Sequence, residues 1–132
     1  GLLPHSLKQL YLFENFNKRL NIPPNVEYLY LNADNQYIID NIPSSVKKIK
    51  FGDYFDLEIC NLPTSIKCII FEENGIYDKP LDCLPDFVES LELNKKYNKE
   101  IKNIPSKLKK VKCGIDYPYC EKFVGCEVIK YF

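Results

Sequence analysis

The feature that most constrains this chain is an internal repeat with a period close to 20 residues. Counted from the first residue of a copy, aliphatic residues fall at positions four and seven, and an aliphatic residue, Phe or Cys falls at position nine. A copy of this length cannot bury its own apolar face, so neighbouring copies must stack to form a core. Copies begin near residues Leu3, Ile22, Ile42, Leu62, Leu84, Ile104 and Val124, each with a following proline except the last.

The repeat predicts strands and a fold that is mainly β. Side chains alternate along a strand, so positions seven and nine face the core, while positions six, eight and ten face outward. Ile, Val, Tyr and Phe are plentiful and favour strand over helix. We therefore expect a leucine-rich-repeat-like solenoid with one short parallel strand per copy and little or no α-helix. Its buried position-seven column is Leu10, Leu29, Ile49, Ile69, Leu91, Val111 and, in the decayed last copy, Tyr131, with Val128 at position four.

Two further columns lie behind the strand and predict the second wall of the core. Position thirteen holds Phe16, Phe55, Tyr97 and Tyr117. Position seventeen holds Leu20, Ile39, Ile59 and Ile101, with Leu81 joining after a two-residue insertion in the fourth copy. We expect that insertion, within residues 73–80, to bulge on the convex side or the rim.

An asparagine precedes the Ile/Leu-Pro step in four copies, and two interpretations remain open. A buried amide must be hydrogen-bonded, so these side chains could form a ladder to the backbone of the adjacent coil, which we favour. Asparagine also tolerates the left-handed turn conformation. The residues are Asn21, Asn41, Asn61 and Asn103.

The six cysteines share no repeat position, which predicts free thiols in preference to disulfides. Bridges between neighbouring copies would usually recur at one position, and no C-x-x-C motif or second histidine completes a zinc site. We expect neither a metal nor a cofactor. The cysteines are Cys60, Cys68, Cys83, Cys113, Cys120 and Cys126.

Charge and composition limit the classes of partner and the compartment. The 18 basic and 18 acidic residues balance, whereas a nucleic-acid binder normally has a strong basic excess. No stretch approaches the roughly 18 apolar residues of a membrane span. We expect an intracellular, cytoplasmic protein that binds neither nucleic acid nor membrane. The chain lacks an initiator methionine and opens on a repeat, so we expect residues 1–132 to be a single repeat domain cut from a longer protein.

No catalytic constellation is apparent, and we predict that the chain is not an enzyme. The lone histidine, His5, occupies the same turn position as Pro24, Ser44 and Thr64. The serines in these turns have no fixed base to activate them. Function must therefore depend on the surface.

The junctions between copies resemble the FNIP repeat, a relative of the leucine-rich repeats known from social amoebae and giant amoeba-infecting viruses. The resemblance rests on Asn21-Ile22-Pro23, Asn41-Ile42-Pro43, Asn61-Leu62-Pro63, Asn103-Ile104-Pro105 and Phe51-Gly52-Asp53-Tyr54-Phe55. It weakens where Cys83 takes the asparagine position and where Phe123 and Gly125 replace Asn and Pro. Similar proteins often join such repeats to an F-box. The resemblance therefore implies that the repeats recognise substrates for a ubiquitin ligase. If the chain is viral, the resemblance implies that this takes place in the cytoplasm of the host cell.

The outward strand positions predict a protein-binding face. Its first two copies present four aromatic residues together, and exposed aromatic clusters are candidate binding hot spots. Three alternatives remain: the aromatics only cover the sheet face or stack on a missing N-terminal domain, the solenoid ends stack in an assembly, or the face binds a glycan or small ligand. The predicted surface is Tyr11, Phe13, Tyr28, Tyr30, Lys48, Lys50, Ile70, Glu92, Lys110 and Lys112.

Overall fold

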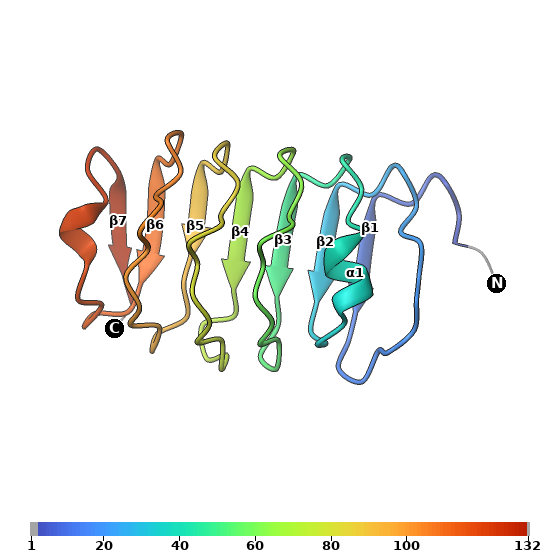
Figure 1. The fold of residues 1–132 in the computed structure, drawn as a ribbon, viewed down its shortest axis with the longest axis horizontal. Helices are drawn as coiled ribbons and strands as arrows, with labels where there is room; N and C mark the ends of the chain where they lie inside the picture. Colours follow the sequence, from blue (N-terminus) through green and yellow to red (C-terminus); the bar gives the residue numbers. More distant parts are fainter. Residues whose placement is uncertain (1–2, 132) are drawn as a thin grey trace.

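The computed structural model describes residues 3–131, which form an elongated coil with one strand in each turn (Figure 1). All seven strands pair in parallel and in chain order within one sheet. This confirms the prediction of a solenoid with one short parallel strand per copy. The strands are β1 (Gln9–Leu12), β2 (Tyr28–Leu31), β3 (Lys48–Phe51), β4 (Cys68–Phe71), β5 (Ser90–Glu92), β6 (Lys110–Cys113) and β7 (Glu127–Lys130).

The predicted position-seven column forms the inner face of the sheet from β1 to β6. Each residue pairs in register with its equivalent in the next copy, and all six are buried. Position nine packs beside it, where the rings of Phe51 and Phe71 stack with centroids 5.1 Å apart. The hydrophobic period therefore sets both the register and the core. The buried column is Leu10, Leu29, Ile49, Ile69, Leu91 and Val111.

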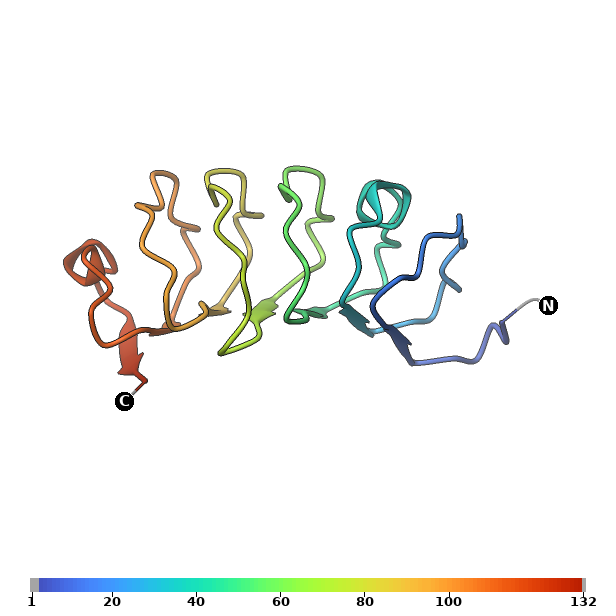
Figure 2. The ribbon, with the colours of Figure 1, turned by 90° about the horizontal axis from the view of Figure 1, so that it is seen from below.

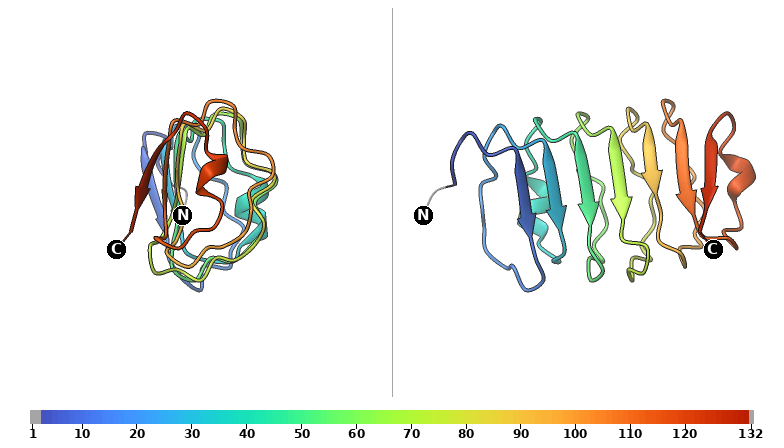
Figure 3. Two further views of the ribbon diagram at one scale, coloured as in Figure 1. Left: turned by 90° about the vertical axis from the view of Figure 1, so that its left-hand side faces the viewer. Right: turned by 180° about the vertical axis from the view of Figure 1, so that it is seen from behind.

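The return segments form the wall opposite the sheet, as Figures 2 and 3 show from below and along the axis. Successive rings of this wall stack at centroid distances of 5.9, 6.2, 6.4 and 5.9 Å. Tyr77 takes the aromatic place in the longer fourth copy. The resulting aromatic ladder is Phe55, Tyr77, Tyr97, Tyr117 and Phe123.

The second copy has an asparagine where other copies have the ladder ring, and here the chain forms its one short α-helix among residues 3–131. Asn35 caps α1 (Gln36–Asp40) by accepting a hydrogen bond from the Ile38 amide. Its side-chain nitrogen also donates to the carbonyls of Phe16 and Lys18 in the preceding coil. A 3₁₀ turn, η1 (Cys120–Lys122), occupies the last return segment.

The junction asparagines do not form the predicted buried ladder. Asn21, Asn41, Asn61 and Asn103 are all exposed, and only Asn103 donates to backbone of the preceding coil, at 3.0 Å from the Asp82 oxygen. The left-handed alternative is also wrong, because Asn15 is the single non-glycine residue with positive φ among residues 3–131. The reason is alternation: the aliphatic residue after each asparagine turns inward, so the amide faces solvent.

Buried amides occur instead at position ten, which we had expected to face outward. Asn32 and Asn94 are 5% and 2% exposed, respectively. The Asn94 amide donates to the Tyr77 carbonyl, and the Asn94 oxygen accepts from the Lys96 amide. Position ten therefore belongs to the turn that ends each strand, where side chains pair with backbone.

The last copy has a different register from the predicted one. Val128 pairs with Val111, so it occupies position seven, and Tyr131 follows the strand. The turn accounts for two residues of this shift, because the Cys126 amide donates to the Phe123 carbonyl as the Leu108 amide donates to the Pro105 carbonyl in the previous copy. The third comes from the segment between Phe123 and Val128, which is one residue shorter than that between Pro105 and Val111. Phe123 thus replaces the junction proline, and the copy begins earlier than its sequence suggests.

The prediction of six free thiols is wrong for one pair. Cys60 and Cys83 form a disulfide between the third and fourth copies, with their Cα atoms 4.8 Å apart. Cys83 occupies the junction position equivalent to Asn61, the residue after Cys60. The two bridged cysteines are therefore offset by one position in the repeat. A bridge of this kind need not recur in other copies. Both cysteines are exposed.

Candidate interaction surface

Four aromatic side chains, three from β1 and β2 and one from the residue after β1, gather on the outward face of the sheet. We call them the aromatic patch: Tyr11, Phe13, Tyr28 and Tyr30. The ring of Tyr11 lies 5.5 Å from Tyr28 and 5.8 Å from Tyr30, and Phe13 lies 5.8 Å from Tyr30. Tyr11 and Phe13 remain 49% and 60% exposed. The structure therefore brings together all four aromatic residues predicted from the repeat.

Strand register places these rings. Tyr11 and Tyr30 are direct partners across β1 and β2, while the intervening leucines point into the core. Phe13 follows β1 in a tight turn closed by the Phe16 amide on the Phe13 carbonyl, at 3.2 Å. Asn15 lies within that turn with φ of 70°, a conformation that asparagine tolerates.

The patch carries no charge of its own at neutral pH. Partial burial raises the pKa of Tyr28, and the neighbouring Tyr11 hydroxyl adds to the effect. Burial also raises the pKa of Tyr30, with a further contribution from Glu72. The phenols of Tyr28 and Tyr30 therefore stay protonated and can donate or accept hydrogen bonds. Lys48 borders the patch, with its ammonium 5.7 Å from the centre of the Tyr28 ring.

A charged groove of about 220 Å³ follows the patch along the sheet. Lys50 forms an ion pair with Glu72 at 3.2 Å, and both side chains are about one-third exposed. The predicted residues Lys50, Ile70, Glu92 and Lys112 all line the groove, whereas Lys110 lies outside it on an exposed outer position.

Tyr131 forms one wall of this groove and is not among the predicted surface residues. Its ring lies under the Lys112 ammonium, 4.7 Å from the nitrogen, and only 7% of the residue is exposed. Burial raises the pKa of Tyr131 to about 12, with Glu92 adding to the effect. Gly125 as the equivalent of the junction proline places Tyr131 at position seven in the core, and not beside Lys112 on the outward face. Comparing the spacing from Phe123 to Val128 with that from Pro105 to Val111 could have shown that the last copy is compressed.

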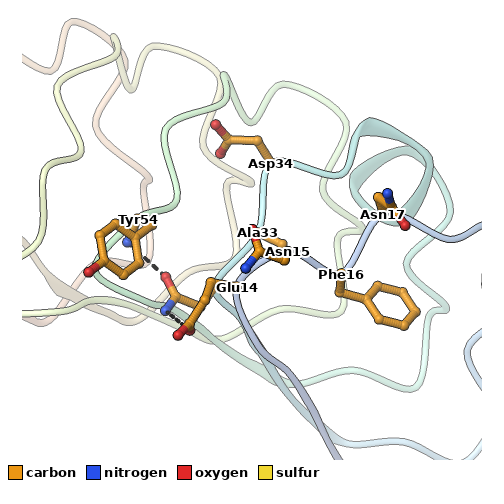
Figure 4. Close-up of a pocket in the computed structure, with 8 residues that line it drawn as sticks. Glu14, Asn15, Phe16, Asn17, Ala33, Asp34 and Tyr54 are labelled. Carbon is orange, nitrogen blue, oxygen red and sulfur yellow. Dashed lines mark hydrogen bonds between the residues drawn. The ribbon is translucent and has the colours of Figure 1, made fainter.

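A hollow of about 560 Å³ opens beside the patch at the C-terminal ends of β1 and β2 (Figure 4). Asn32 spans it, donating to Glu14 Oε2 at 3.3 Å and accepting from the Tyr54 amide at 2.7 Å. Gly52 is required beneath this side chain, because a Cβ there would clash with the Asn32 amide group. Every polar atom of the Asn32 side chain is thus used within the fold.

The insertion of the fourth copy lines a second hollow of about 440 Å³ at the rim, between residues 73–78 and 94–96. The prediction that this segment would lie on the convex side or the rim agrees with that position. Across residues 3–131 no cluster of three or more His, Cys, Asp and Glu side chains could hold a metal ion. Within the same residues, no helix is long and apolar enough to cross a membrane.

Two stretches of the chain, residues 35–74 and 77–114, match the FNIP Repeat family model and together cover more than half of the chain. The chain belongs to the FNIP repeat family. An FNIP repeat-containing protein of Dictyostelium discoideum is 29% identical in an alignment 104 residues long, which covers 69% of this chain and 29% of that protein. The crystal structure of CroV588, a circular leucine-rich-repeat protein, superposes with a TM-score of 0.65 at 22% identity.

These likenesses confirm the fold and leave the partner open. The superposition covers 84% of this chain and 21% of CroV588, so the chain spans about a fifth of that protein and under a third of the Dictyostelium relative. Repeat solenoids of this kind offer long surfaces for binding other macromolecules. The FNIP array is accordingly consistent with an interaction module or a structural repeat module.

Proposed function

We propose that this chain is a protein-interaction module in which the aromatic patch anchors a partner protein. The observation that carries the proposal is the contiguity of Tyr11, Phe13, Tyr28 and Tyr30, each within 6.5 Å of another ring of the patch. Aromatic residues supply large contact area with few rotatable bonds, and they dominate measured hot spots. Three of the rings are also held on paired strands and Phe13 is held in a hydrogen-bonded turn, so little order has to be gained on binding.

The charged groove would set orientation more than affinity. Its ion pair between Lys50 and Glu72 is partly exposed, and such pairs contribute about 1 kcal/mol or less. Charges at a rim mainly affect the association rate and weaken with salt. On this proposal the patch supplies most of the binding energy, while Lys48, Glu92, Lys110 and Lys112 guide the encounter.

Alanine variants separate these two contributions. Tyr11→Ala with Tyr30→Ala should abolish capture of partners from a Dictyostelium discoideum lysate, with a melting temperature close to that of the wild type. Loss of a hot-spot aromatic costs about 2 kcal/mol or more of binding energy. Lys110→Ala with Lys112→Ala should retain capture and only slow association.

A matched aromatic control tests whether the patch is special. Tyr54 and Phe87 are 60% and 46% exposed and lie outside the patch. Tyr54→Ala with Phe87→Ala should capture the same proteins as the wild type. If the Tyr11 and Tyr30 variant captured them equally well, the binding surface would lie elsewhere, such as residues 73–80 or the remainder of a longer protein.

The same chain distinguishes the other classes. Mass that rises with concentration, without partner capture, would favour an assembly that stacks solenoid ends. Binding on a glycan array that is lost in the Tyr11 and Tyr30 variant would favour a sugar-binding face. Either result, in the absence of a protein partner, would contradict the proposal.

We further propose that the module belongs to a longer protein in which it selects substrates for an F-box-type ubiquitin ligase. Support for this step comes from the resemblance of the repeat junctions to those of F-box-linked arrays and from the small share of the Dictyostelium relative that the chain spans. The test is to purify the full-length protein and look for ligase subunits. Their absence, with partner capture intact, would leave a binding module without that role.

A further inference from the structure

The C-terminal coil brings two sulfur atoms and one ammonium group together away from the binding face. Cys113 ends β6 and is fully buried, while Cys120 begins η1 and is half-buried. Their Sγ atoms lie 3.7 Å apart. The Nζ atom of Lys130, at the end of β7, lies 2.7 Å from the Cys120 sulfur. None of these three residues takes part in the aromatic patch or the charged groove.

Lys130 is unusual among the lysines of the chain. It pairs in register with Cys113, at a position that other copies fill with an inward apolar residue. Within residues 3–131 it forms no ion pair with a carboxylate, and the Cys120 sulfur is its hydrogen-bond partner. That bond raises the pKa of Lys130, so the amine is protonated at neutral pH. A fixed positive charge against a sulfur is the surrounding in which thiolates react.

We propose that Cys113 and Cys120 are a redox-active pair that forms a reversible disulfide, with Cys120 as the attacking thiol and Lys130 as its positioning residue. The sulfur atoms are already in contact and must close to about 2.05 Å. Cys120 lies in the short turn η1 and is half-buried, so closure moves the less enclosed of the two side chains. The bond would link η1 to β6 and leave Lys130 without its sulfur partner.

The oxidant in this proposal is a low-molecular-weight disulfide such as oxidised glutathione. Cys120 loses its proton to solvent, and the resulting thiolate attacks one sulfur of that disulfide, which forms a mixed disulfide and releases one small thiolate. Cys113 then loses its proton to solvent and attacks the Cys120 sulfur, which releases the second small thiolate. The protein loses two electrons and two protons, and the small disulfide becomes two thiols. Excess reduced thiol reverses both steps.

Burial assigns the two roles. Cys113 is enclosed, and burial raises its pKa to about 11, with the hydrogen bond to Cys120 adding to the effect. It therefore remains a thiol until an electrophilic sulfur is held against it. Cys126 donates a hydrogen bond to the Leu108 carbonyl, and neither it nor Cys68 has a second cysteine sulfur in contact among residues 3–131. These two cysteines are internal controls for general oxidation.

The test equilibrates the folded chain in mixtures of reduced and oxidised glutathione, followed by acid quenching, alkylation and trypsin digestion. Cleavage after Lys112 and Lys122 places both cysteines in one peptide, residues 113–122. The expected product is that peptide lacking two hydrogens and both alkyl groups, with Cys68 and Cys126 still alkylated. Reduced glutathione in excess should restore two alkylation sites.

Variants make the assignment falsifiable. Cys113→Ser should trap the mixed disulfide on Cys120, and Lys130→Gln should slow its formation at least several-fold. Lys122→Gln is the matched control, because that ammonium pairs with Glu100 at 3.0 Å and not with sulfur. Three outcomes would each overturn the proposal. The first is equal modification of Cys68, Cys120 and Cys126, and the second is an unchanged rate of mixed-disulfide formation in Lys130→Gln. The third is a covalent cross-link between Cys120 and Lys130 that contains an added oxygen atom, in place of a disulfide.

Discussion

Tyr97→Phe and Tyr77→Phe remove the same atom from neighbouring rings of the aromatic ladder, yet we expect different effects on stability. Both residues are 3% exposed, and their rings stack with centroids 6.2 Å apart. The Tyr97 hydroxyl donates to the Lys79 carbonyl at 2.8 Å. The Tyr77 hydroxyl is buried without a partner among residues 3–131. The two substitutions therefore isolate one hydrogen bond in a matched apolar setting.

The expected magnitudes follow from what each change leaves behind. Tyr97→Phe leaves a carbonyl unpaired and should lower the free energy of unfolding by about 1 to 2 kcal/mol. Tyr77→Phe removes a buried hydroxyl that makes no hydrogen bond among the described residues, so the free energy of unfolding should be unchanged or raised by up to about 1 kcal/mol. Urea denaturation followed by circular dichroism measures both. Tyr117→Phe should resemble Tyr97→Phe, because its hydroxyl donates to the Lys99 carbonyl at 2.7 Å. Equal losses at Tyr77 and Tyr97 would refute this reasoning.

Three further perturbations test the core, the disulfide and the buried phenols. Ile69→Ala should cost about 2 to 5 kcal/mol in urea denaturation, whereas Val128→Ala, half-buried on the last strand, should cost clearly less. Cys83→Ser should cost about 3 kcal/mol, and a reductant should destabilise the wild type by a similar amount while leaving the variant unchanged. Burial raises the pKa of Tyr131 from 10.0 to about 12, so its contribution is complete below pH 10 and lost as pH rises towards 12. The melting temperature should fall as the pH rises across that range. A melting temperature that does not change with pH would contradict the burial of this phenol.

The sequence predicted the sheet because its signal is repeated. Six copies carry Leu10 or an equivalent at the same position, and each one reinforces the same register. The aromatic patch followed directly, since Tyr11 and Tyr30 hold one outward position in adjacent copies. Recurring apolar and aromatic positions could be read in this way, whereas the direction of the recurring junction asparagines, such as Asn61, could not.

Properties that occur once could not. The Cys60–Cys83 bridge joins residues one position apart in the repeat, and the two-residue insertion hides even that relation. Gly125 as the proline equivalent places Tyr131 at position seven, whereas the hydrogen bond between the Cys126 amide and the Phe123 carbonyl sets the turn and Val128 holds that position. Local hydrogen bonding decides register where the repeat decays.

Side-chain footprinting of the chain with its captured partner tests the central claim most directly. Hydroxyl radicals label exposed aromatic rings, and free protein should be labelled at Tyr11, Phe13, Tyr54 and Phe87, which are 46% to 60% exposed. With the partner bound, labelling at Tyr11 and Phe13 should fall while labelling at Tyr54 and Phe87 stays unchanged. Protection of Tyr54 or Phe87, with Tyr11 and Phe13 still fully labelled, would contradict the assignment of the aromatic patch as the binding site.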